Sequence, residues 1–153
     1  MPSGQFTLFG KNKDDLRIND LVGATIKIAL VTSAYTPDVN SATGHSVFAD
    51  VSANEIAAGN GYVAGGGTPG TNAATAISNG FKFSTADMVF TAAGGSIPAW
   101  RYAVLYVSGN LWGMTNPLIG YFLGDSTPAD IPATTDTNNC TLACPAAGWF
   151  DEV

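Results

Sequence analysis

Residues 24–32 read ATIKIALVT, and this stretch decides the fold. Within it Ile26, Ile28 and Leu30 recur at every second position, which is the spacing of side chains along one face of a β-strand, so one buried face is expected. Residues 101–107 read RYAVLYV and are apolar at almost every position, which is typical of a strand buried on both faces. The two stretches together favour a mostly β fold.

Turn-forming residues divide the rest of the chain into short segments, since it contains 18 Gly and 8 Pro. The sharpest hairpin signal is Asn79-Gly80, because a type I′ turn needs positive φ at both central residues. Weaker strand candidates are residues 5–9, 61–64, 73–78, 88–91, 118–123 and 149–153. Short strands between regular turns predict a β-sandwich or a jelly-roll-like domain.

One short helix is expected to begin at Ser52, because Ser52 and Glu55 have the spacing of a capping box. Gly59 would end this helix after one or two turns. The length of 153 residues suits a single β domain over residues 1–153. Within it, residues 1–20 are a candidate extended N-terminal arm, and residues 126–145 are expected to form a long loop or an edge segment.

The charge pattern argues against a nucleic-acid partner, and the lack of long apolar runs argues against a membrane span. The net charge is −6, and after Lys27 only Lys82 and Arg101 are basic, so no basic stripe is available for nucleic acid. No run approaches the roughly 18 apolar residues of a membrane span, and no secretory signal is expected, which predicts synthesis and folding in the cytoplasm. We expect Arg101 to pair with Asp87.

The basic residues near the start of the chain are Lys11, Lys13 and Arg17. Residues 11–15 carry charges of both signs, which is typical of a solvated loop; the alternative is an arm that docks on an acidic partner.

Residues able to carry chemistry are few. His45 is the one histidine, and a histidine in a polar turn is usually a surface or hydrogen-bonding residue; a small hydrolase using His45, Ser46 and an Asp is the alternative. Cys140 and Cys144 could be reduced thiols, a disulfide or part of a metal site, and cytoplasmic synthesis favours thiols. No catalytic, cofactor-binding or metal-binding residue is assigned, and no enzymatic activity is expected.

Four segments occur in a familiar order: NEI at residues 54–56, GYVAGG at 61–66, RYAVLY at 101–106 and NPLIGY at 116–121. As an ordered set they resemble a group of small virion structural proteins of tailed bacteriophages. The resemblance covers roughly residues 45–125, with a weaker match in AGWF near the end of the chain. The chain departs from the group in the turn at Val107-Ser108-Gly109, where an acidic turn is common, and in the segment 127–145.

The resemblance implies a capsid decoration or cement protein that binds the major capsid protein on the outer surface of the virion, as a homodimer or homotrimer and without a cofactor. The alternatives are a tail, neck or baseplate component, or a carbohydrate- or receptor-binding β-sandwich in which Trp100 or Trp112 stacks on a sugar ring. The candidate interface residues are Lys11, Lys13, Arg17, Trp100 and Trp112.

Overall fold

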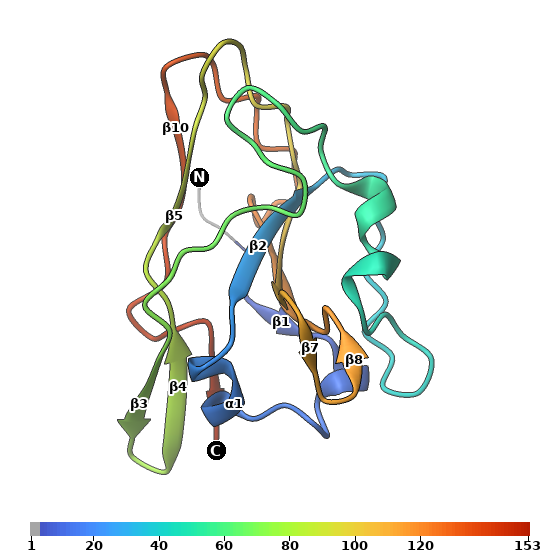
Figure 1. Cartoon of the computed structure of the whole chain (residues 1–153), viewed down its shortest axis with the longest axis vertical. Helices are drawn as coiled ribbons and strands as arrows, with labels where there is room; N and C mark the ends of the chain where they lie inside the picture. Colours follow the sequence, from blue (N-terminus) through green and yellow to red (C-terminus); the bar gives the residue numbers. More distant parts are fainter. Residues whose placement is uncertain (1–3) are drawn as a thin grey trace.

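A four-stranded antiparallel sheet forms the centre of the computed structural model, which describes residues 4–153 (Figure 1). Its strands, in spatial order, are β1 (Thr7–Leu8), β9 (Leu118–Leu123), β6 (Tyr102–Val107) and β2 (Ile26–Val31). β2 and β6 pair over their full lengths, and Ile28 lies opposite Leu105. The two strands with the strongest apolar signal therefore form the middle of the fold.

Both faces of this sheet are covered. One face packs into a larger apolar cluster together with side chains of β4, β5 and β10. The other face packs against a second cluster that contains Tyr35 and Phe48 from the connection after β2. Ala29 and Val31 are therefore fully buried. The prediction of a single buried face for residues 24–32 is wrong, because this connection covers the face left open in that prediction.

Five further strands form a second, interrupted layer. Three of them, β11 (Phe150–Glu152), β4 (Gly80–Ser84) and β3 (Ala73–Ile77), make one antiparallel sheet, and β10 (Asn139–Leu142) pairs with β5 (Met88–Thr91). In total 38% of the chain is strand and 9% is helix, which confirms the mostly β prediction. Except for residues 61–64, each weaker strand candidate contains a strand of the structure, usually shorter than predicted.

The remaining elements are short. They are η1 (Gly10–Asn12), α1 (Ile18–Val22), η2 (Phe48–Asp50), η3 (Ser52–Asn54), and the small hairpin of β7 (Asn110–Leu111) and β8 (Met114–Thr115). Among residues 4–153, α1 is the one α-helix, so one short helix is present but not where it was predicted. No helix in this part of the chain is long and apolar enough to cross a membrane.

The segment from Ser52 forms only the 3₁₀ turn η3, and the predicted helix is wrong. No side chain caps this turn. The carboxylate of Glu55 instead accepts a hydrogen bond from the hydroxyl of Tyr62 and one from the backbone N–H of Gly65, each at 2.6 Å. The residue that suggested a capping box thus holds the following loop in place.

Residues 61–64 do not form the predicted strand. Asn60 and Gly61 have φ values of 54° and 97°, which close a turn between Gly59 and Tyr62. The hydroxyl of Tyr62 then accepts a hydrogen bond from the backbone N–H of Leu30 at 2.9 Å. This segment packs on β2 as a loop because its tyrosine is buried in the core.

The predicted hairpin around residue 79 is present, but its turn is displaced by one residue. Ile77 pairs with Gly80, so the two-residue loop is Ser78-Asn79, and neither residue has positive φ. A Cβ at Gly80 would overlap the carbonyl oxygen of Glu152 in β11. The glycine therefore serves a close approach between strands rather than a type I′ turn.

Residues 1–20 were predicted to form an extended arm. Residues 4–20 do not form one, and residues 1–3 lie outside the described part of the chain. β1 pairs with β9, and Phe9 and Ile18 are only 1% and 2% exposed. These apolar side chains bind the segment to the core. Of residues 126–145, the first part is a loop and residues 139–142 form β10, which pairs only with β5 within the described residues.

Candidate functional site

One end of the molecule brings together segments from the beginning, middle and end of the chain. Figure 1 shows α1, the β3–β4 hairpin and the C-terminus at this end, which we call the hairpin end. A hollow of about 370 Å³ lies between these elements. Its lining residues are Arg17, Ile18, Asn19, Ala74, Asn79, Gly80, Phe81, Glu152 and Val153.

Specific hydrogen bonds hold α1 against the hairpin. The Glu152 carboxylate accepts a hydrogen bond from the backbone N–H of Ile18 at 2.7 Å, which satisfies one of the free donors at the helix start. The side-chain amide of Asn72 donates to the carbonyl oxygens of Leu21 and Ala24, at 3.1 and 2.7 Å. The short helix is therefore positioned by residues distant in sequence rather than by its own propensity.

Apolar side chains are exposed at the hairpin end. Phe81 is 51% exposed and Val153 is 80% exposed, and both line the hollow. Val22, the last residue of α1, is 40% exposed. Exposed apolar side chains that gather around a hollow are typical of a surface that binds another protein.

β3 adds an unprotected strand edge to this surface. It is the outer strand of its sheet, and its three central residues are all exposed. Ala73-Ala74-Thr75-Ala76-Ile77 carries no charge and no proline, the two devices that usually prevent an edge from pairing with another chain. The edge of β2, in contrast, is covered by bridges to Glu55 and Gly67. Sequence reasoning missed the β3 edge, although the uncharged run of residues 71–81 is its signal.

The predicted basic residues are exposed but do not form one patch. Arg17 lines the hollow of the hairpin end, and Lys13 lines a neighbouring depression beside Phe150. Lys11 lies close enough to Asp50 to affect its carboxyl. Burial raises the pKa of Asp50, but two backbone hydrogen bonds and the charges of His45 and Lys11 lower it by more, so the pKa is below its usual value. Of the three predicted cations, only Arg17 lines the hollow together with the exposed apolar side chains.

The two predicted tryptophans differ in exposure. Trp100 is only 3% exposed, so its assignment to a surface interface or a sugar-stacking platform is wrong; a large aromatic side chain at this position fills the core. Trp112 is half-buried, and its indole N–H donates to Asp20 of α1 at 3.0 Å. Trp112 therefore lies near the hairpin end and Trp100 does not contribute to that surface.

The predicted pair of Arg101 and Asp87 is also wrong. Arg101 Nε lies 2.8 Å from Asp130 Oδ1 in a partly exposed ion pair. Asp87 Oδ1 instead accepts a hydrogen bond from the backbone N–H of Cys144 at 2.9 Å. The long loop before β10 brings Asp130 to the start of β6, a contact that sequence distance does not reveal.

The remaining chemically active side chains are dispersed. His45 Nδ1 lies 2.8 Å from the hydroxyl of Tyr35, and the two rings stack. Cys140 and Cys144 are free thiols, and burial raises the pKa of both. Within residues 4–153, no group of three or more His, Cys, Asp or Glu side chains could hold a metal ion.

Comparisons of the chain with protein-family models, with curated proteins and with solved structures give no match.

Proposed function

We propose that this chain is a structural protein of a tailed-bacteriophage virion, a decoration or cement protein that binds the assembled head and bridges neighbouring copies of the major capsid protein. The ordered motifs of residues 54–121 support the phage assignment by resemblance. The observation that carries the binding role is the uncharged free edge of β3 beside exposed Phe81 and Val153. On this proposal the protein needs no cofactor and no catalytic residue.

The hairpin end supports a role in association. A free edge offers backbone donors and acceptors to a partner strand, and exposed apolar side chains beside it add contact area. Arg17 lines this surface and would attract an acidic partner. We propose that the chain forms a homodimer or homotrimer on the shell, with the β3 edges or hairpin ends at the contact.

We also propose that the two layers form an irregular β-sandwich. The larger apolar cluster supports this, because it joins β2 and β6 to Phe83 of β4, Phe90 of β5 and Leu142 of β10. The second layer is interrupted where β4 and β5 are separated by residues 85–87.

Binding to shells tests this function directly. Purified protein is mixed with shells that lack it, and co-sedimentation is measured over a range of salt concentrations. We expect wild type to sediment with shells, and the triple variant Lys11→Ala/Lys13→Ala/Arg17→Ala to bind more weakly at low salt, because screening acts over roughly 10 Å at 0.1 M salt. The difference should shrink as salt rises.

An edge variant separates the apolar surface from the cations. Ala74→Lys places a charge on the β3 edge and should abolish binding, whereas Ala58→Lys changes an exposed alanine outside the strands and should not. Wild type that fails to sediment with shells but binds isolated tails would replace the head assignment by a tail, neck or baseplate one. Wild type that binds neither would contradict the proposal.

A further inference from the structure

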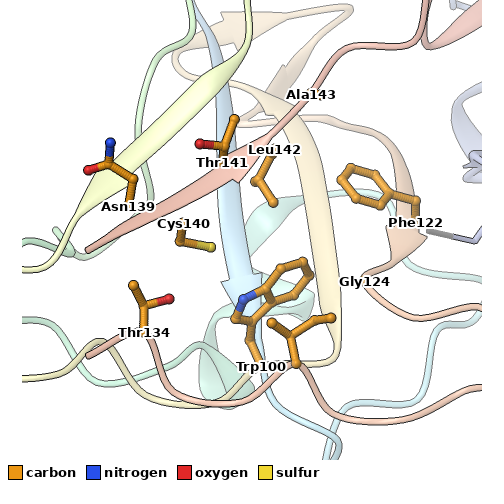
Figure 2. Close-up of a pocket in the computed structure, with 10 residues that line it drawn as sticks. Trp100, Phe122, Gly124, Thr134, Asn139, Cys140, Thr141, Leu142 and Ala143 are labelled. Atoms are coloured by element: carbon orange, nitrogen blue, oxygen red, sulfur yellow. The ribbon is translucent and has the colours of Figure 1, made fainter. Parts of the chain in front are cut away.

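A second cavity, of about 390 Å³, lies at the opposite side of the second layer, along the outer edge of β10 (Figure 2). All residues from Asn139 to Ala143 line one of its walls. The other walls come from Trp100, Phe122, Gly124, Ile131 and Thr134. The volume is far larger than that of a single water molecule and is sufficient for a large side chain of a partner.

Trp100 lines this cavity, and its indole N–H has only a sulfur atom as a partner. The residue is 97% buried, since only 3% of its surface is exposed, and its indole nitrogen has no hydrogen-bonding oxygen or nitrogen within residues 4–153. Figure 2 shows the indole nitrogen facing the thiol of Cys140, which is a weak acceptor. Because a thiol is a weak acceptor, an oxygen atom that enters the cavity beside Cys140 can replace it as the partner of this buried N–H.

The backbone of β10 supplies further free groups beside the cavity. The N–H of Ala92 donates to the carbonyl of Asn138, and in an antiparallel ladder this fixes which residues face β5. Cys140 and Leu142 then bond to β5, while the N–H and C=O groups of Asn139 and Thr141 point away from it. In the described part of the chain no other strand pairs with this edge.

The surroundings of the cavity are acidic. Asp125, Asp130 and Asp136 lie within three positions of a lining residue, and Asp87 bonds to Cys144 at the end of that wall. The cations nearby are Arg101, which pairs with Asp130, and Lys82, whose charge acts on Cys144. A second copy of this chain, with a net charge of −6, is therefore a poor occupant, and a basic segment of another protein fits better.

We propose that the outer edge of β10 binds an extended, basic peptide segment of a partner protein by strand addition. The peptide backbone pairs with Asn139 and Thr141, and one uncharged side chain enters the cavity and offers an oxygen acceptor to the indole N–H of Trp100. Backbone pairing gives affinity in such complexes, and the pocket for alternate side chains gives specificity. This binding site is separate from the hairpin end and does not depend on the proposed function.

Selection from a random heptapeptide display library tests the proposal. Wild type should enrich peptides that carry Lys or Arg and lack Asp and Glu. Thr141→Pro removes an N–H that faces away from β5, so the protein should fold and the enrichment should disappear. Thr141→Val keeps the N–H and is the matched control, which should select the same peptides as wild type.

Two measurements identify the contacts of a selected peptide. In ¹⁵N-labelled protein, the peptide should shift the indole resonance of Trp100, identified by its loss in Trp100→Phe, and the amides of Asn139 and Thr141. Trp100→Phe should weaken binding about tenfold, the order expected for one lost hydrogen bond, and Trp112→Phe should leave it unchanged. A peptide N-methylated at alternate residues should not bind wild type, which gives the same information if Thr141→Pro fails to fold.

Three results would overturn the inference. They are a library that yields no enriched peptides with wild type, enriched peptides that are acidic, and a bound peptide that leaves the Trp100 indole and the β10 amides unshifted. Concentration-dependent self-association through the same amides would show that a second copy, and not a basic partner, occupies the edge.

Discussion

Raising the pH from 10 to 12 is expected to unfold this protein cooperatively, because three of its five tyrosines are buried with raised pKa values. Burial raises the pKa of Tyr106 to about 12. Burial also raises the pKa of Tyr35 and of Tyr62, and the hydrogen bond from Tyr62 to Glu55 raises the latter further. The phenolate form is therefore disfavoured at these positions while the core is intact.

The sign of the effect follows from proton binding. An unfolded tyrosine has a pKa of about 10, so above that pH the unfolded chain holds fewer protons than the folded one. The stability from these tyrosines is fully present below pH 10 and is lost as the pH rises toward the folded pKa values. Each contributes up to about 1.4 kcal/mol per pH unit, so three contribute up to about 4 kcal/mol per unit, against a typical total of about 5–15 kcal/mol.

Tyrosinate absorbance and near-ultraviolet circular dichroism, recorded through the same titration, check this prediction. The absorbance of the buried tyrosines should rise only as the tertiary signal is lost. Tyr106→Phe should reduce the slope of unfolding free energy against pH by the share of one tyrosine. Ionisation of all five tyrosines near pH 10 with an unchanged dichroism spectrum would contradict the buried positions.

Leu105→Ala is expected to lower the free energy of unfolding by about 2–5 kcal/mol, the range for removing a fully buried leucine side chain. Leu105 lies in the central strand β6 between Ile28 of β2 and Gly120 of β9, so the surrounding strands cannot easily close the cavity. Val63→Ala is the control, because Val63 is 68% exposed and should change stability by less than about 0.5 kcal/mol. Urea denaturation measures both, and equal midpoints would contradict the assignment of β6 to the centre of the core.

The strands could be predicted where apolar residues alone decide their position. β6 is a continuous apolar run, and β2 is apolar at every position except Lys27, so both strands are expected in the core. The sequence wrongly predicted a helix at Ser52. The decisive contact is between the Glu55 side chain and a later tyrosine and loop, which the local sequence does not show. α1 was missed for the same reason: its ends are satisfied by Asn72 and Glu152, far along the chain.

The candidate site was predicted only in part. The exposure of Lys13 and Arg17 follows from their charge, and the structure places Arg17 at the hairpin end and Lys13 in a different depression. Trp100 was misplaced because a tryptophan suits a core as well as an interface, and its type does not distinguish the two. Phe81 was missed because an apolar residue that alternates along a strand normally faces the core, and its exposure depends on the hairpin extending past the body.

The location and copy number of the chain in purified phage particles test the proposed function most directly. Cryo-electron microscopy should show density for this fold on the outer surface of the head, repeated around local symmetry axes, with the hairpin end at the contacts. Quantitative mass spectrometry of the same particles should give many copies, in a fixed ratio to the major capsid protein. A few copies per particle located in the tail, or complete absence from the particle, would contradict the decoration assignment.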